Sequence, residues 1–276
     1  KVICDKNFMD IIVNRIDAGK YWTDSGASFG VLPRAIWGKE VQTDELHRRM
    51  LALNLLLICL PERVILVDTG LGNRLSEKQI SIYNPSPFML PVSLAELGVR
   101  DIDVTDVILT HLHFDHCGGV ITNFGDKERL TFPRAKYWIQ KSEWEMAKHP
   151  DDLNKASYDF EHQLYLLEQS NQYELIEGNL DIAEGVTLIK TGGHTVGSQI
   201  VEIDTSSEFY IYPADIIPTF FHISLAVTSA YDLSRTETYK AKLYIYSRLK
   251  EKKGTLLLNH DPQRWEVNFS EIKYCK

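Results

Sequence analysis

The chain has 276 residues, of which 44% are hydrophobic and 25% are charged, and this composition excludes a disordered or fibrous protein. The net charge of −8 argues against a nucleic-acid partner, because nucleic-acid binding draws most of its affinity from clustered basic charge. The longest apolar run, residues 51–60, contains Asn54 and is about half as long as a membrane span, so no membrane partner is expected. Because no repeat or linker-like stretch is present, we predict one domain over residues 1–276.

Runs rich in Val, Ile and Leu predict early strands at residues 10–16, 51–60 and 64–68. Between the first two strands, residues 18–42 carry several glycines and a proline. We expect this stretch to be a long irregular connection, of the kind that often forms a lid or a binding loop. A second irregular stretch is expected at residues 84–91, where three prolines occur.

The second half of the chain alternates short strands with helices. Residues 106–110 are predicted to form a short buried strand that ends at a cluster of histidines. The other predicted elements are strands at 135–140, 186–190, 199–203, 208–212 and 255–258, and helices at 142–148, 158–169 and 236–252. This mixture predicts the α/β (α+β) class, with sheets covered by helices.

The four cysteines form no CxxC pair and no tight framework; they are Cys4, Cys59, Cys117 and Cys275. A domain of this size does not need disulfides, so we expect reduced thiols. The N-terminus shows no signal-peptide pattern. Together these features predict a cytoplasmic location.

The most informative segment is residues 110–119, which read THLHFDHCGG. At the end of a strand, His111 and His113 would project from the same face, and Asp115 and His116 would lie on the loop that follows. Three imidazoles and a carboxylate so close together would repel one another if the imidazoles were protonated, and would be poorly satisfied if buried and neutral. A divalent metal resolves both problems, since zinc, iron and manganese accept imidazole nitrogen and carboxylate oxygen. The alternative is a polar turn with hydrogen-bonded histidines.

The pattern HxHxDH followed by Gly-Gly resembles the signature of the metallo-β-lactamase superfamily. Further similarities follow in the same chain order, over residues 51–261. Residues 68–70 (Asp-Thr-Gly) are similar to the turn that this family places near its metal site. His194, between Gly193 and Thr195, resembles the third histidine of the first metal site. Asp215 matches the aspartate that bridges two metals, and His260 matches the last histidine of the second site.

The resemblance implies an αβ/βα four-layer sandwich that holds two divalent metal ions, zinc in the first place, with iron or manganese as alternatives. The first ion would be bound by His111, His113 and His194. The second would be bound by Asp115, His116 and His260. Asp215 and a hydroxide would bridge both ions, so that Asp115 and Asp215 are the implied catalytic residues. Asp68 is expected to orient a ligand rather than bind metal, since metal-bound histidines usually donate their other N–H to an acceptor behind them.

Several branches of the superfamily differ from this sequence. Class B β-lactamases typically carry a cysteine near the position of Asp215. Quorum-quenching lactonases place a catalytic tyrosine shortly after that aspartate, where this chain has Ile-Ile-Pro at residues 216–218. Residues 28–33 and the loop from Asp215 to His222 look more like the methyl-parathion-hydrolase-like group. These comparisons favour a hydrolase that cleaves a small neutral ester-like bond, in a carboxylic ester, a lactone or a phosphotriester.

Aromatic side chains around the expected ligands predict an apolar pocket wall, made by Phe29, Trp37, Phe114, Phe220 and Phe221, with Leu32 and His222 beside them. Such a wall would favour neutral, hydrophobic small-molecule substrates, although some of these aromatics could be core residues and His222 could lie on the surface. Two other functions are left open: a mononuclear iron oxidoreductase of the sulfur-dioxygenase type, and a metal-binding protein without turnover. A homodimer is left open as well.

Overall fold

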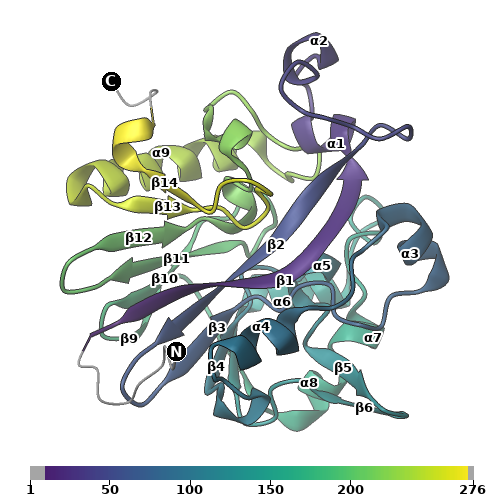
Figure 1. Ribbon diagram of the computed structural model, residues 1–276, viewed down its shortest axis with the longest axis vertical. Coiled ribbons are helices and arrows are strands. Elements are labelled where there is room, and N and C mark those ends of the chain that lie inside the picture. Colours follow the sequence, from purple (N-terminus) through teal and green to yellow (C-terminus); the bar gives the residue numbers. More distant parts are fainter. Residues whose placement is uncertain (1–9, 273–276) are drawn as a thin grey trace.

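The computed structural model describes residues 10–272, and two six-stranded sheets form its centre (Figure 1). In spatial order, the first sheet contains β1 (Ile12–Asp24), β2 (Arg48–Cys59), β3 (Val64–Val67), β4 (Asp106–Ile108), β7 (Lys136–Gln140) and β8 (Tyr173–Ile176). The second sheet contains β14 (Glu266–Asn268), β13 (Thr255–Leu257), β12 (Phe209–Tyr212), β11 (Gln199–Asp204), β10 (Val186–Lys190) and β9 (Leu180–Ala183). A separate hairpin joins β5 (Ile121–Phe124) and β6 (Lys127–Leu130).

Helices cover the outer face of each sheet. The first sheet is covered by α4 (Leu90–Glu96), α6 (Lys141–Lys148), α7 (Phe160–Gln163) and α8 (Tyr165–Ser170), with α3 (Glu77–Tyr83) beside β1. The second sheet is covered by α9 (Arg235–Lys252). The short helices α1 (Ser25–Phe29) and α2 (Arg34–Trp37) follow β1, and α5 (Phe114–Cys117) lies within the histidine motif.

Three separate buried clusters show that these elements form four layers. One cluster lies between the sheets and combines residues such as Leu56 and Val67 of the first sheet with Val201 of the second. Another joins the first sheet to its helices, and a third joins the second sheet to α9. The four-layer sandwich predicted from the family resemblance is therefore confirmed. It also explains why β2 is almost continuously apolar, because a strand buried on both faces has no solvent side to leave polar.

The long irregular connection predicted at residues 18–42 is wrong in its first part, because β1 continues to Asp24 and pairs with β2 as far as Arg48. The pairing shifts register between Asp17 and Lys20, where Gly19 has a φ of +116°. A bulge of this kind bends the strand without ending it. In the sequence alone, however, a glycine suggests that a strand ends there. The predicted helix at 158–169 is likewise two short helices, which meet at Leu164.

The cysteines also differ from the expectation. Cys59 is disulfide-bonded, so the expectation of reduced thiols is wrong at this residue, whereas Cys117 is a free and buried thiol. Cys4 and Cys275 lie outside the described residues. The cysteines therefore give no support to a cytoplasmic location. Among the described residues, no helix combines the length and the apolar composition that crossing a membrane requires.

Candidate metal centre

The predicted ligands lie just beyond the ends of strands that run in one direction. In the first sheet, β3 and β4 are parallel. In the second sheet β12 and β13 are parallel, and β10 shares their direction because β11 is antiparallel to both β10 and β12. The chain leaving β4, β10, β12 and β13 carries the motif histidines, His194, Asp215 and His260 in turn. The two sheets thus bring residues distant in the sequence to one edge of the sandwich.

The turn after β3 is locked to the histidine motif through backbone contacts. Gly118 and Gly119 lie so close to it that an added Cβ would stand 2.3 Å from the Leu71 oxygen and 2.2 Å from the Thr69 oxygen, respectively. A β-bridge joins Gly70 to Cys117. The two motif glycines therefore allow the close approach of another backbone segment.

Asp68 is buried at the start of this turn and has a φ of +62°, which an aspartate adopts only when its surroundings require it. Its carboxylate accepts hydrogen bonds from the Thr110 amide at 2.8 Å and from Nδ1 of His116 at 2.8 Å. The backbone therefore aims Asp68 at Nδ1 of His116, on the side of the ring away from the other imidazoles, which is where an orienting group would have to lie.

The other imidazoles are oriented in the same way. Nδ1 of His194 donates to Asp232 at 2.8 Å, and Nδ1 of His260 donates to the Ala52 carbonyl at 2.8 Å. Because a carboxylate and a carbonyl only accept, the neutral rings of His116, His194 and His260 must each turn a bare Nε2 lone pair inwards.

These inward-facing nitrogens lie at hydrogen-bonding distance from one another, so each close pair needs a proton or a metal ion between its two nitrogens. Nε2 of His260 is 3.2 Å from Nε2 of His116, and Nε2 of His194 is 3.1 Å from Nδ1 of His113. Nε2 of His111 is buried and has no hydrogen-bond partner among the described residues. A buried polar atom without a partner is costly, and a metal ion would satisfy all of these atoms at once. The residues present therefore fit a metal centre.

Asp215 lies between the two groups of imidazoles. Its Oδ1 is 3.2 Å from Nε2 of both His116 and His260, and its Oδ2 is 3.3 Å from Nε2 of His194. Ligand atoms within 4.8 Å of one another form three groups: His111 with His113 and His194, His111 with His116 and Asp215, and Asp115 with His116 and His260. The structure thus brings together all seven ligands named from the sequence.

The electrostatics of the cluster follow from burial and from these contacts. Burial and the neighbouring imidazoles hold the pKa of His111 well below its usual value. Burial also opposes protonation of His116, but the carboxylates of Asp215 and Asp68 outweigh it and raise the pKa of His116 well above 6.5. The imidazoles of His116, His260 and His194 overcome the effect of burial on Asp215 and keep the pKa of Asp215 well below 3.8. The carboxylate of Asp215 is therefore ionised, and the histidines of the centre differ in how strongly they bind a proton. A metal ion would have to displace the protons that they hold.

Two positioning residues were missed by sequence reasoning. Asp232 follows no strand and belongs to no motif, so nothing in the sequence connects it to His194. Glu143 of α6 is buried, and its carboxylate accepts hydrogen bonds from the Leu112 amide, the Tyr158 hydroxyl, the Thr195 hydroxyl and the Gly197 amide. This one carboxylate ties the motif loop to the loop that carries His194.

Tyr21 was missed as well. Its hydroxyl donates to Oδ2 of Asp115 at 2.5 Å, although Tyr21 lies in the stretch that the sequence predicted to be irregular. A phenol therefore reaches the centre from β1, whereas the position after Asp215, where lactonases carry their tyrosine, has none. The signal that could have found Tyr21 is its alternation with Thr23 on a strand, since both side chains are buried.

The ligand cluster opens into a pocket of about 140 Å³. Its wall combines ligands with residues of β1, β2 and later loops, among them Tyr21, Thr23, Arg49, Leu51, Thr219 and Tyr231. Five of the seven predicted ligands line this pocket, and we call the part that they form the metal end: His113, Asp115, His194, Asp215 and His260. Phe114 and His222 line the pocket as the sequence suggested, and His222 is buried rather than on the surface.

The remaining predicted wall residues lie elsewhere. Phe29 and Trp37 are buried and stack on each other, with ring centroids 5.3 Å apart, in a small core cluster that Phe221 also contacts. Phe220 is 40% exposed and lies under the guanidinium of Arg264. The aromatic side chains of the pocket are therefore mainly tyrosines, Tyr21, Tyr83 and Tyr231, because the predicted rings other than Phe114 pack outside it.

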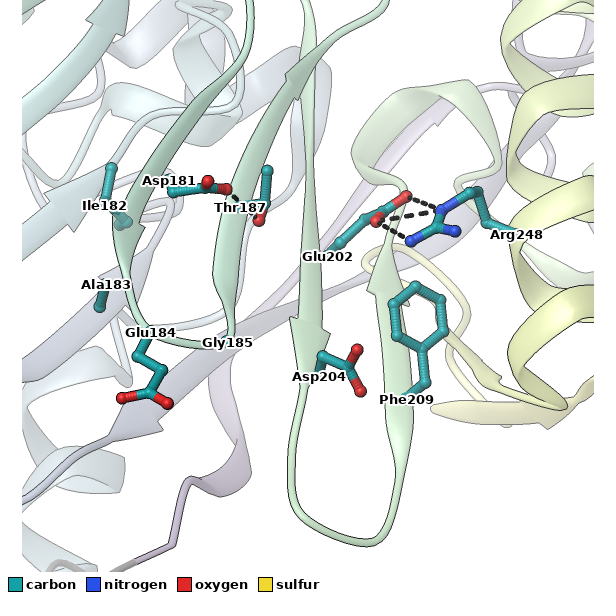
Figure 2. Close-up of a pocket in the computed structure, with 10 residues that line it drawn as sticks. All are labelled: Asp181, Ile182, Ala183, Glu184, Gly185, Thr187, Glu202, Asp204, Phe209 and Arg248. Carbon is teal, nitrogen blue, oxygen red and sulfur yellow. Dashed lines mark hydrogen bonds and ion pairs between the residues drawn. The ribbon is translucent and has the colours of Figure 1, made fainter.

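A larger hollow, of about 520 Å³, lies over the second sheet and α9, and Figure 2 shows the charged side chains that line it, two of which, Glu202 and Arg248, pair with each other. Glu202 forms an ion pair with Arg248 at 3.1 Å, and Asp181 accepts a hydrogen bond from Thr187. None of the candidate metal-binding groups among the described residues lies in this hollow. We therefore place the chemistry in the smaller pocket.

Comparison with known proteins agrees with this geometry. The sequence model described as the metallo-beta-lactamase superfamily matches residues 51–265. The chain belongs to the metallo-β-lactamase superfamily. Its match to the N-acyl homoserine lactonase of Bacillus cereus is 29% identical over 155 residues, which cover 52% of this chain and 55% of that protein. The chain thus spans about half the length of the curated relatives it matches.

Solved structures of the superfamily extend the similarity to nearly the whole chain. A probable metal-dependent hydrolase from Staphylococcus aureus has a TM-score of 0.88 at 26% identity, covering 95% of this chain and 93% of that one. AidC, a dizinc quorum-quenching lactonase solved with a product, has a TM-score of 0.75 at 22% identity, covering 94% and 90%. The second likeness concerns the fold alone.

Proposed function

We propose that this chain is a metal-dependent hydrolase that cleaves a small ester-like bond with two divalent ions, zinc in the first place and iron or manganese as alternatives. One observation carries the proposal: the two oxygens of Asp215 face two different groups of imidazoles. A carboxylate placed in this way suits a bridge between two ions. The names of the relatives add support, since those reported above are a lactonase and a probable metal-dependent hydrolase.

When bound, the two ions would polarise the carbonyl or phosphoryl oxygen of the substrate and make a water molecule nucleophilic at neutral pH. The first ion would be held by His111, His113 and His194. The second would be held by Asp115, His116 and His260, with Asp215 between the two sites. Asp68, Asp232 and the Ala52 carbonyl would keep the imidazoles turned towards the ions.

Two carboxylates of the ligand groups line the pocket, Asp115 and Asp215, and we assign proton movement to Asp115 because Asp215 faces both groups of imidazoles and is assigned to the bridge. We propose that Asp115 takes a proton from the attacking water and delivers it to the leaving oxygen. The hydroxyl of Tyr21 donates to Oδ2 of this carboxylate and would hold it in one position during the transfer. Tyr21 would then act through Asp115, as a positioning residue.

The substrate is proposed to be a carboxylic ester, a lactone or a phosphotriester. Since the curated relative from Bacillus cereus is named as a lactonase, lactones are the class to test first. The test is a screen of aryl esters, lactones and phosphotriesters on protein purified without chelator, with elemental analysis of the same sample. We expect close to two metal equivalents per chain, and turnover that chelation abolishes and metal restores.

Other outcomes would point to the alternatives. Less than one equivalent under metal-replete conditions would contradict the two-ion proposal. A coloured protein containing iron, which consumes dioxygen and hydrolyses none of the three classes, would instead be a mononuclear oxidoreductase. Two bound metals without turnover on any of these substrates would make the chain a metal-binding protein.

A further inference from the structure

Arg49 lies on the same wall of the pocket as Tyr21. In the antiparallel ladder of β1 and β2, Tyr21 pairs with Leu51 and Thr23 pairs with Arg49, and all four side chains line the pocket. Two residues of a strand span about 7 Å. Arg49 therefore lies one step along the ladder from the pair that contains Tyr21, which itself touches the ligand Asp115. We call this part of the pocket the Arg49 end.

The guanidinium of Arg49 is buried without a partner. The side chain is 6% exposed, and its Nε and Nη1 atoms are buried with no hydrogen-bond acceptor among the described residues. None of the ion pairs within residues 10–272 includes Arg49 either. Burial lowers its pKa to about 10, so the group is still a cation at neutral pH. Buried charges are normally paired, because an unpaired one carries a large desolvation penalty.

The carboxylate whose charge acts most strongly on Arg49 is hydrogen-bonded to other groups. Asp261 raises the pKa of Arg49 through its charge, yet its Oδ1 accepts hydrogen bonds from the Gln263 and Arg264 amides and its Oδ2 accepts one from the Phe220 amide. These three backbone donors hold the carboxylate in the loop after His260. Asp261 therefore does not neutralise Arg49 by direct contact.

The neutral groups of the same wall are also engaged. His222 is neutral, because burial and the charges of Arg49 and Lys242 lower its pKa to about 3. Its Nε2 donates to the Ser28 carbonyl, and its Nδ1 accepts from the hydroxyl of Thr219. Among the described residues, no side chain of this wall accepts a hydrogen bond from the guanidinium, so its N–H groups are free to bind an acceptor that enters the pocket.

The way Arg49 is held restricts the shape of that acceptor. The guanidinium carbon lies 4.8 Å from the ring centroid of Phe29, which covers one face of the group. Acceptors must then approach in the plane of the guanidinium, along its N–H bonds. A planar carboxylate meets this requirement better than a point-like anion does.

We propose that the substrate carries a carboxylate in addition to its scissile ester-like bond, and that Arg49 binds this carboxylate. The inference rests on the proposed function, since it places the scissile bond at the metal end of the same pocket. It replaces the expectation of a neutral, hydrophobic substrate, which depended on five aromatic residues of which only Phe114 lines the pocket. Arg49 would thus determine substrate specificity without taking part in bond cleavage.

The test compares two esters that differ only at the far end of the acyl chain: 4-nitrophenyl hexanoate and the mono-4-nitrophenyl ester of adipic acid. Glutarate and suberate monoesters, with their monoacid counterparts, extend the series to shorter and longer chains. We expect wild-type kcat/KM to favour the carboxylated ester by about 10- to 100-fold at the best chain length, as a charge-assisted hydrogen bond would give. In Arg49→Met this preference should fall to within about threefold of unity.

A neighbouring arginine supplies the matched control. Arg48 precedes Arg49 on β2 but bonds to Asp44 and does not line the pocket. Arg48→Met removes a charge one residue away and should keep the preference for the carboxylated ester. Arg49→Lys, which keeps the charge but loses the planar donor array, should retain only part of it. Thermal unfolding and metal content of each variant show whether it is folded and loaded.

Binding measured without hydrolysis separates this inference from the proposed function. Calorimetry with adipate and with hexanoate isolates the second carboxylate, because both compounds offer one carboxylate to the metal end. Tighter binding of adipate to the wild type, lost in Arg49→Met and kept in Arg48→Met, would support the inference even if no ester were hydrolysed. Equal binding of the two acids at every chain length, or an adipate preference that survives in Arg49→Met, would overturn it.

Discussion

At the metal end of the pocket, the imidazoles of His116, His194 and His260 are each held from behind by an acceptor of the protein. At the Arg49 end, the buried Nε and Nη1 atoms of a guanidinium have no acceptor within residues 10–272. Both ends are polar and largely buried, yet hydrogen bonds to the protein fix the imidazoles of the first end, whereas the guanidinium of the second end makes none within the described residues. This difference fits our two proposals, in which the pre-oriented metal end cleaves the bond and the guanidinium of Arg49 selects the substrate.

The largest effect is expected from the residue that joins the two halves of the metal end. Asp215→Ala removes the carboxylate that faces both groups of imidazoles. We expect metal content to fall from about two equivalents to one, and kcat to fall by about 10²- to 10³-fold with a smaller change in KM. Both are measured on the same sample. Two retained ions with near-normal turnover would show that Asp215 is only a turn residue.

A smaller effect is expected from the acceptors behind the ligands. Asp232→Ala leaves Nδ1 of His194 without its partner, so metal affinity should fall by about 10- to 100-fold. Asp232→Asn, whose side-chain oxygen can still accept, should recover part of the loss. The matched control is Asp159→Ala, because Asp159 makes the same kind of contact with His162 on the surface. Equal metal affinity in Asp232→Ala and Asp159→Ala would refute the orienting role.

Tyr21 tests whether the wall between the two ends contributes to turnover. Tyr21→Phe removes only the hydroxyl that donates to Asp115. We expect kcat to fall by about tenfold while metal content stays the same, since one charge-assisted hydrogen bond is lost. Tyr231→Phe serves as the control, because Tyr231 lines the same pocket but makes only a 3.3 Å contact with Thr23. A loss of metal in Tyr21→Phe would mean that Tyr21 supports the ligand rather than the reaction.

The smallest effect is a pH dependence of the stability of the metal-free protein. The carboxylates of Asp215 and Asp68 outweigh burial and raise the pKa of His116 above 6.5, and Asp215 and Asp232 do the same for His194. The stability that these two groups contribute is complete below pH 6.5 and is lost as pH rises through their folded-state pKa values. The lowered pKa values of His111 and His113 act only below pH 6.5.

Between pH 6.5 and 8, the chelated protein should therefore lose a few degrees of melting temperature. Because bound metal displaces the same protons, the gain in melting temperature on adding zinc should grow over this window. Parallel thermal melts with chelator and with zinc provide the measurement. A zinc-induced gain that shrinks as pH rises would contradict the assignment of inward-facing, proton-binding imidazoles.

The seven candidate ligands could be named from the sequence because a metal centre needs the same kinds of side chain at several similar places in the chain. Each ligand follows a strand, is a histidine or an aspartate, and belongs to a short recognisable motif. The four-layer fold could be predicted with them through the family resemblance. Asp232, Glu143 and Tyr21 could not be predicted, because one hydrogen bond from the right direction leaves no pattern along the chain.

The pocket wall was difficult to predict for a different reason. Phe29 and Trp37 look equally suitable for a wall or a core, and only their packing against each other decides between the two. Arg49 was difficult to recognise because it is the second residue of a strand whose later residues are almost entirely apolar. A charged residue at the start of a strand is ordinarily solvated, and its burial depends on the bulged continuation of β1 beside it.

The interlocked backbone at Gly118 and Gly119 limits how this site can be remodelled. With less than 2.5 Å available to a Cβ at either position, every library that randomises these two glycines would consist mostly of misfolded members. Residues 110–119 also cannot be transplanted alone, because their backbone packs directly against residues 69–71. Carrying this centre into another scaffold therefore requires that both segments be moved together, with the spacing between them preserved.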